Sequence, residues 1–235
     1  MQLDVSGLKS GYGKVQILHG VDFCIRPSEI TTVLGPNGAG KSTLMKTISG
    51  HLPAMAGDIR YRGESLAGLG PLAVCKAGVG YVPQDANVFP DLSVYDNLLA
   101  SSLAFEGAAS RMAEVLQRFP ILEERANQLA STLSGGERQT LAIGTALVAG
   151  LDILILDEPT AGLAPIFVDR IVSWVRELAE DGMGVVWVVE QNPEKILAIS
   201  ETAYVIDAGR NSETVAAKSL LEPGRLEEVL LQVHV

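Results

Sequence analysis

One glycine-rich stretch of the chain has the residue types and spacing of a phosphate-binding loop. Residues 35–43 fit the pattern G-x-x-x-x-G-K-[ST]. Glycines let successive backbone N–H groups turn inward around an anion, and a helix N-terminus adds partial positive charge there. We expect the Lys41 ammonium to neutralise the β- and γ-phosphates and the Ser42 hydroxyl to face Mg²⁺. The phosphate-binding residues of this prediction are Gly35, Pro36, Asn37, Gly38, Ala39, Gly40, Lys41, Ser42 and Thr43.

The segments on either side of this loop are those that such a motif needs. The apolar run at residues 30–34 predicts a buried strand, and residues 43–48 predict a helix. The alternative is a glycine-rich turn that binds nothing. The order strand, glycine loop, helix favours the phosphate site.

A second apolar strand ends in two carboxylates. Residues 153–158 read Ile-Leu-Ile-Leu-Asp-Glu. A nucleotide with Mg²⁺ needs an acidic residue near the metal, and Asp157 fits that role. Hydrolysis also needs a group that orients and polarises water, and Glu158 fits as the general base. The alternative is a strand that simply ends in acidic loop residues.

A third signal lies at residues 133–139, where Ser134, Gly135 and Gly136 precede a predicted helix. The open N–H groups of that helix end make a second anion site. If two chains pair head to tail, each Ser134 segment faces the γ-phosphate in the Lys41 loop of the other chain. Ser134 and Glu137 also have the S-x-x-E spacing of a capping box, and both interpretations can be true.

Two further residues occupy positions suited to a nucleotide. Tyr12 lies in a predicted loop at residues 10–14, where its ring could stack on a base or could be half-buried in a turn. Gln84 follows the predicted strand 79–82, at the end of the sheet where ligands of open α/β sheets bind.

Composition limits the class of protein. Hydrophobic residues make up 47% and aromatic residues 5% of the 235 residues, which suits an α/β protein with a buried parallel sheet. The net charge of −10 argues against a nucleic-acid partner. Cys24 and Cys75 are far apart, so we expect reduced, buried thiols rather than a disulfide. The sequence shows neither a secretory signal nor a membrane span, so any membrane link would go through a partner.

The periodicity predicts a mostly parallel α/β sheet with two additions. Residues 2–9 and 21–26 alternate as antiparallel strands, with a short strand at 57–63. Strands at 79–82, 153–158, 185–189 and 203–206, with a helix at 168–178, imply βαβ units. Residues 91–131 read as helical, with Ser93 as an N-cap and helices at 108–119 and 122–129, and a last helix is expected at 226–233. We expect a catalytic core from 1–90 and 150–235 and an α-helical subdomain from 91–149.

Together these motifs resemble the nucleotide-binding subunit of ABC transporters over nearly the whole chain. Residues 35–43 match the Walker A loop, residues 153–157 the Walker B strand, and residues 133–139 the LSGGQ-type motif. Tyr12 falls at the aromatic that stacks on adenine, Glu158 at the catalytic glutamate, and Gln84 at the glutamine that senses Mg²⁺ and the γ-phosphate and touches the membrane subunit. The resemblance implies a P-loop NTPase core with an N-terminal antiparallel β-subdomain and an inserted helical subdomain.

Two departures from the family pattern point to a subgroup. Ala164 stands where the D-loop usually has aspartate, and Gln191 replaces the switch histidine. These segments, with residues 89–98, resemble the subgroup that serves branched-chain amino-acid importers. Gln191 can donate one hydrogen bond to the γ-phosphate but cannot carry a proton, so the chemical burden falls on Glu158. Residues 211–214 are polar where the subgroup has a short strand and an acidic helix, so we assign this tail no function.

The resemblance implies an ATPase that binds ATP and Mg²⁺, with Ser42, Gln84 and Asp157 near the metal and Glu158, Gln191 and Lys41 in catalysis. It implies pairing with a second ABC ATPase, identical or not, around two ATP molecules. The partners would be integral membrane permease subunits and, indirectly, a substrate-binding protein. The chain would then lie in the cytoplasm, on the inner face of the cell membrane.

Several alternatives stay open at this point. The cargo could be urea, a short amide or lipopolysaccharide, because similar subunits serve these. A non-transport ABC ATPase would be expected to carry two ATPase halves or long coiled-coil insertions. A small P-loop kinase would leave Ser134, Gly135 and Gly136 unexplained, and a degenerate, binding-only subunit is disfavoured by the presence of Glu158 and Ser134.

Overall fold

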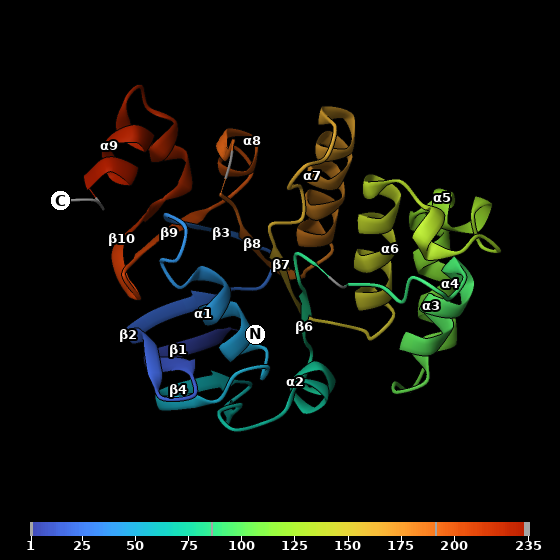
Figure 1. Cartoon of the computed structure of the whole chain (residues 1–235), viewed down its shortest axis with the longest axis horizontal. Helices are drawn as coiled ribbons and strands as arrows, with labels where there is room; N and C mark the ends of the chain where they lie inside the picture. Colours follow the sequence, from blue (N-terminus) through green and yellow to red (C-terminus); the bar gives the residue numbers. More distant parts are fainter. Residues whose placement is uncertain (1, 86, 191, 233–235) are drawn as a thin grey trace.

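The computed structural model describes residues 2–85, 87–190 and 192–232, and a six-stranded sheet forms its centre (Figure 1). The strand order is β10-β9-β3-β8-β7-β6. All neighbours are parallel except β10, which runs antiparallel to β9 at the edge. The strands are β3 (Ile30–Leu34), β6 (Val79–Val82), β7 (Ile153–Asp157), β8 (Gly184–Val188), β9 (Thr202–Asp207) and β10 (Arg210–Ala216).

A second, antiparallel sheet has the order β2-β1-β4-β5. Its strands are β1 (Leu3–Tyr12), β2 (Val15–Ile25), β4 (Ala54–Tyr61) and β5 (Glu64–Ser65). Strands β1 and β2 show the alternation that the sequence predicts, but β1 continues to Tyr12 and only residues 13 and 14 form the turn. The predicted loop at 10–14 is therefore wrong: Tyr12 lies at the end of a strand, paired with Val15.

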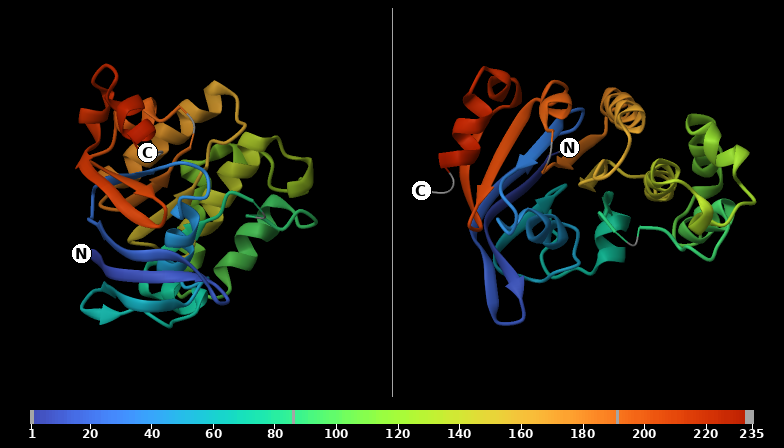
Figure 2. Two further views of the ribbon diagram at one scale, coloured as in Figure 1. Left: turned by 60° about the vertical axis from the view of Figure 1, so that its left-hand side comes forward. Right: turned by 45° about the horizontal axis from the view of Figure 1, so that its top comes forward.

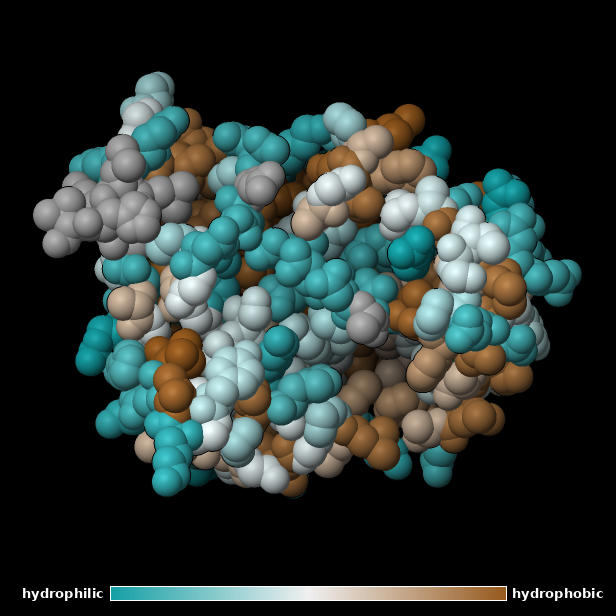
Figure 3. Space-filling model, viewed as in Figure 1, coloured by the Kyte–Doolittle hydropathy of each residue, from teal (hydrophilic) through white to brown (hydrophobic). Residues whose placement is uncertain are grey.

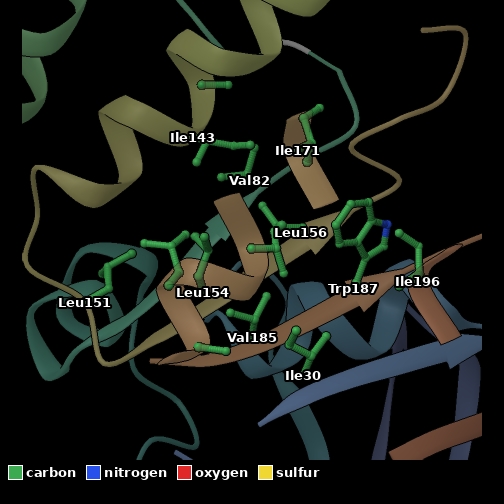
Figure 4. Packing of buried hydrophobic residues seen from close by; sticks show 14 of the residues in the cluster. Ile30, Val82, Ile143, Leu151, Leu154, Leu156, Ile171, Val185, Trp187 and Ile196 are labelled. Carbon is green, nitrogen blue, oxygen red and sulfur yellow. The ribbon is translucent and has the colours of Figure 1, made fainter. Parts of the chain in front are cut away.

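Side-chain alternation divides the core between the two faces of the central sheet. Leu154 and Leu156 of β7 belong to one cluster, and Ile153 and Ile155 belong to the other. Figure 4 shows Leu156 and Trp187 of the first cluster directed toward the side where α6 and α7 pack. The second cluster is completed by α1 and by the antiparallel sheet, so the parallel strands of the central sheet are buried on both faces, as a parallel sheet requires.

Helices of the middle segment gather at one end of the molecule, opposite the C-terminal α9 (Figures 1 and 2). The α-helices are α1 (Lys41–Ile48), α2 (Pro71–Ala77), α3 (Val94–Ser102), α4 (Ala108–Arg118), α5 (Pro120–Glu124), α6 (Gly135–Leu147), α7 (Pro165–Glu180), α8 (Glu194–Leu197) and α9 (Arg225–Gln232). Short 3-10 helices follow at η1 (Ala130–Thr132) and η2 (Ala217–Leu221). The predicted N-cap of α3 is confirmed, because the Ser93 side chain accepts a hydrogen bond from the Asp96 backbone N–H.

The predicted helix at 122–129 is wrong beyond Glu124, where α5 ends. The next residues turn back toward the start of α3. The backbone N–H of Val94 donates to the Gln128 carbonyl at 2.9 Å, and that of Tyr95 donates to the Ala126 carbonyl at 2.9 Å. Both N–H groups belong to the first turn of α3 and have no acceptor inside that helix. Their hydrogen bonds to residues 126 and 128 hold this segment in a turn, although its sequence has helical spacing.

The polar tail also differs from its prediction. Residues 211–214 lie in β10, whose residues alternate between exposed and half-buried. An edge strand with one wet face suits polar residues, which explains why a strand formed where the sequence seemed too polar for one. The short strand that the sequence seemed to lack after residue 210 is therefore present.

Candidate functional site

The loop between β3 and α1 has the backbone geometry that its glycines allow. Gly35 has φ +147°, and a Cβ there would lie 2.0 Å from the Ile206 carbonyl oxygen. Gly40 has φ +105° and is the N-cap of α1, which has no side-chain cap. Asn37 and Gly38 are exposed at the tip of the loop. The first N–H groups of α1 therefore face the loop without a side-chain acceptor of their own.

Lys41 lies buried beneath this loop. Its ammonium donates to the Gly35 carbonyl at 2.7 Å and to the Pro36 carbonyl at 3.0 Å. Burial lowers the pKa of Lys41, and the nearby carboxylates of Glu158, Glu190 and Asp157 oppose that shift. The sequence-predicted lysine is thus in the same pocket as both sequence-predicted acids.

Asp157, at the C-terminal end of β7, is only 3% exposed. The Ser42 hydroxyl donates to its Oδ1 at 3.2 Å. Mg²⁺ is usually bound by one or two protein oxygens together with waters and substrate phosphates, rather than by an all-protein cage. One hydroxyl and one carboxylate side by side fit that donor set, and within the described residues no group of three or more His, Cys, Asp or Glu side chains is arranged so that it could hold a metal ion.

Glu158 follows directly but is no longer part of the strand. Its φ is +50°, and its N–H donates to the Val188 carbonyl at 3.1 Å. A positive φ at a non-glycine residue costs energy and often marks a functional position. Burial raises the pKa of the Glu158 carboxyl, with Glu190 and Asp157 adding to the shift and Lys41 opposing it. Gln84 donates to Glu158 Oε2 at 3.2 Å, which joins two predicted residues that follow different strands, β6 and β7.

Glu190 is a residue of this site to which the sequence analysis gave no role. Its Oε1 accepts a hydrogen bond from Asn37 Nδ2 at 2.8 Å. The bond ties the tip of the Lys41 loop to the segment that follows β8. The only sequence signal is its place after a buried strand of the parallel sheet, since such strand ends meet at one edge. Gln191, the next residue, lies outside the described residues.

Tyr81 of β6 is a second residue without a predicted role. Its hydroxyl donates to Asp157 Oδ2 at 2.8 Å. The sequence marks it only as a polar group in an otherwise apolar strand. Both oxygens of Asp157 therefore accept hydrogen bonds, one from α1 and one from β6.

The N-terminus of α6 has the predicted capping box. The Ser134 hydroxyl accepts from the Glu137 N–H at 3.3 Å, and the Glu137 carboxylate accepts from the Ser134 N–H at 2.9 Å. Hydrogen bonds from Ser134 lower the pKa of Glu137. A Cβ at Gly136 would lie 2.2 Å from the Phe167 ring, so this position has room only for hydrogen.

The predicted residues do not all come together within one chain. Gly135 lines a cavity of about 250 Å³ with Gln84 and Glu158. Tyr12, at 48% exposure, lies at the end of β1. Figure 3 shows hydrophilic residues across the middle of the face seen in Figure 1 and hydrophobic ones at its lower right. In the described part of the chain, the hydrogen bonds of Ser134 are those of its capping box and the bond that its carbonyl accepts from the Arg138 N–H at 2.9 Å, and none of them reaches the Lys41 loop.

Comparison with known proteins identifies the family of this chain. Residues 18–161 match the family described as ABC transporter. The chain belongs to the ABC transporter family. It is an ATP-binding subunit of this family, whose members are ATPases, and the resemblance seen in the sequence is confirmed.

Similar proteins within the family include two with a named amino-acid cargo. A high-affinity branched-chain amino acid transport ATP-binding protein of Pseudomonas aeruginosa is 42% identical over 85% of this chain and 86% of its own length. A probable branched-chain amino acid transport ATP-binding protein of Archaeoglobus fulgidus is 40% identical over 96% of this chain and 97% of its own. A lipopolysaccharide export system ATP-binding protein of Escherichia coli is 34% identical over 99% of this chain and 94% of its own length.

Solved structures of the family confirm the predicted fold class. A nucleotide-free ATP-binding cassette from an ABC transporter superposes with a TM-score of 0.89 at 22% identity, covering 100% of this chain and 99% of that one. Among the helices of residues 2–85, 87–190 and 192–232, none combines the length and apolar character needed to cross a bilayer.

Proposed function

We propose that this chain hydrolyses Mg²⁺-bound ATP to drive an importer of branched-chain or other hydrophobic amino acids. The observation that carries the ATPase chemistry is the meeting of Lys41, the Ser42–Asp157 pair and Glu158 at one edge of the parallel sheet. The cargo is supported by the 42% and 40% identical relatives, which are named for branched-chain amino acid transport. No residue of this chain would contact the cargo.

In this proposal each residue acts on one part of the nucleotide. The loop from Gly35 to Thr43 binds the phosphates through backbone N–H groups, and Lys41 binds the β- and γ-phosphate oxygens. Ser42 and Asp157 would hold Mg²⁺, together with Gln84, which bonds to the neighbouring Glu158. When bound, the metal neutralises charge on the phosphates. Tyr12 stacks on the adenine ring.

Glu158 takes the proton of the attacking water. Its raised pKa brings its basicity closer to that of a general base working near neutral pH. The hydrogen bond from Gln84 orients its carboxylate. Gln191 would add a hydrogen bond to the γ-phosphate without transferring a proton.

The active form in this proposal is a head-to-tail pair around two ATP molecules. Ser134, Gly135, Gly136 and Glu137 of one chain then face the γ-phosphate bound by the Lys41 loop of the other. The exposure of Ser134 and Gly135 supports a contact made between chains.

A membrane permease is the proposed second partner, and it would keep the chain on the inner face of the membrane. A cavity of about 290 Å³ lies between β6, α3 and α6 and is lined largely by small residues such as Ala100, Ala104 and Ala146. Apolar side chains just before and just after α3 are exposed nearby, including Phe89 at 59% and Leu103 at 81%. Hydrophobic residues gather over this lower-right part of the molecule in Figure 3. Exposed apolar surface of this kind suits a protein partner.

Lipopolysaccharide export is the second candidate for the transported substrate. It is favoured by the 34% identical Escherichia coli relative, which matches 99% of this chain. Reconstitution with the proposed permease subunits would separate the two. We expect ATP hydrolysis to be stimulated by a binding protein loaded with leucine, isoleucine or valine. Stimulation by lipopolysaccharide, urea or a short amide instead would contradict the amino-acid cargo.

The substitution Glu158→Gln tests the ATPase chemistry. The amide keeps the size of the side chain but cannot accept the proton, so we expect turnover to fall by about 10²–10⁴-fold. ATP binding should persist and a dimer should accumulate, measured by phosphate release and by size-exclusion chromatography with ATP. Glu180→Gln, at the far end of α7, is the matched control and should behave as wild type. Brisk hydrolysis by the Glu158→Gln protein would rule out the assigned base.

A further inference from the structure

The buried carboxylate of Asp157 has a different donor on each oxygen. Oδ1 accepts from the Ser42 hydroxyl at 3.2 Å, and Oδ2 accepts from the Tyr81 hydroxyl at 2.8 Å. Ser42 belongs to the nucleotide loop, and its hydroxyl is also a proposed ligand of Mg²⁺. Tyr81 contacts neither the loop nor Glu158 in any recorded hydrogen bond, so within the described residues its hydroxyl serves the carboxylate alone.

The sheet geometry brings these two side chains together. Strands β6 and β7 are parallel neighbours, with Tyr81 opposite Ile155 (Figure 1). Asp157 lies two residues beyond Ile155 and so projects from the same face. Tyr81 packs on the cluster that contains Ile155, which is the α1 side of the sheet. A tyrosine is long enough to span the diagonal, which a serine or threonine on β6 would not do.

The Tyr81 ring is itself fixed in position. Its centroid lies 5.3 Å from that of His51, with the ring planes tilted by 57°. His51 Nδ1 lies 3.0 Å from the Ser49 hydroxyl at the end of α1.

We propose that Tyr81 is a positioning residue, which orients the Asp157 carboxylate so that it can hold Mg²⁺ beside Ser42. This inference rests on the proposed Mg²⁺-dependent function. With Oδ2 held by Tyr81, the carboxylate is fixed in one orientation and its Oδ1 faces Ser42 at the start of α1. Partners of this kind, one step removed from a metal, typically change metal affinity by about 10–100-fold when they are lost.

The test is Tyr81→Phe, which removes one oxygen and keeps the ring against His51. With Mn²⁺ as the probe and ADP bound, electron paramagnetic resonance should show Mn²⁺ affinity at least about tenfold weaker than in wild type. ADP affinity in EDTA should be unchanged, because the hydroxyl that is removed bonds to the Asp157 carboxylate and not to the nucleotide loop. Tyr61→Phe is the matched control: Tyr61 is a tyrosine of β4 that is 2% exposed and lies in the other sheet, and its loss should leave Mn²⁺ affinity unaltered.

Asp157→Asn separates failure of this inference from failure of the proposed function. If that variant binds Mn²⁺ as wild type does, the proposed metal site is wrong. If Asp157→Asn loses Mn²⁺ while Tyr81→Phe retains wild-type affinity, only the role of Tyr81 is refuted. A Tyr81→Phe protein that loses ADP affinity in EDTA as strongly as Mn²⁺ affinity would also refute it, because the effect would then be general.

A second measurement applies even if Tyr81→Phe folds poorly. In protein carrying 3-fluorotyrosine, the ¹⁹F resonance of position 81 should shift when Mg²⁺ is added to the ADP complex. The resonance of position 61 should not shift. An unmoved resonance at position 81 would contradict the inference.

Discussion

The N-termini of α1 and α6 are the two helix ends to which the sequence assigned phosphate, and they are built differently. The end of α1 is preceded by Gly40, has no side-chain cap and has no acidic residue in its first turn. The end of α6 is capped by Ser134 and carries Glu137, whose carboxylate accepts a hydrogen bond from the Ser134 N–H. Lys41 adds a buried cation at the first end, and a carboxylate occupies the second.

This difference indicates different strengths of anion binding. An uncapped helix end with a buried lysine can bind phosphate within one chain. A helix end that already satisfies its own donors with its own carboxylate gains less from an added anion, and Glu137 opposes it. We therefore expect α1 to provide most of the nucleotide affinity, and α6 to act only when a second chain brings ATP to it.

The largest effect is expected at α1. Lys41→Ala removes a charged donor from the phosphates, and we expect ATP affinity to fall about 100-fold, or ~3 kcal/mol. Isothermal titration calorimetry with ATP measures this. Lys46→Ala, which removes the lysine in the last turn of the same helix, is the control and should bind ATP normally. Unchanged binding by the Lys41→Ala protein would refute the contrast between the two helix ends.

A smaller and different effect is expected at α6. Ser134→Ala removes an N-cap, so the free energy of unfolding should fall by about 1 kcal/mol. Ser93→Ala removes the equivalent cap of α3 and is the matched control, with a similar loss measured by thermal unfolding. Only Ser134→Ala should also reduce ATP-dependent dimer formation and turnover, while ATP affinity of the single chain stays the same. Equal turnover in both variants would leave Ser134 as a cap and nothing more.

The smallest effect concerns Glu137 and pH. Its pKa is lower in the folded chain than in the unfolded chain because Ser134 donates to it. Its carboxylate therefore stabilises the fold above the unfolded pKa, and that contribution is lost as pH falls through the lower, folded pKa. Near pH 7, Glu137→Gln should be less stable than wild type by about 0.3–1 kcal/mol. Thermal unfolding at decreasing pH should show the two proteins converge, and a gap that persists in acid would contradict this account.

Local patterns in the sequence predicted the elements and both helix ends. The strand before the Lys41 loop, the cap at Ser93 and the capping box at Ser134 each depend on residues within a few positions of one another. All three are confirmed. The errors arose where distant segments compete. Residues 125–128 bond to the start of α3 instead of continuing a helix, and the polar residues 211–214 pair with β9 as an edge strand.

The residues of the candidate site also fall into two groups: those that a local motif predicts and those that only long-range contacts bring in. Lys41, Ser42, Asp157 and Glu158 could be named from motifs because each motif is a short run of neighbouring residues. Glu190 and Tyr81 had no such signal. The Asn37–Glu190 bond spans 153 residues and the Tyr81–Asp157 bond spans 76 residues.

The sequence by itself determined the order of strands, glycine loop and helices, and with it the family and the residues to which we assign the chemistry. Only the tertiary structure decided which side chains hold those residues in place. The reason is that parallel strands distant in the sequence become neighbours 4.7–4.9 Å apart, at about the spacing typical of sheets. A buried carboxylate such as Asp157 must then find its donors among whichever side chains the adjacent strand and helix present.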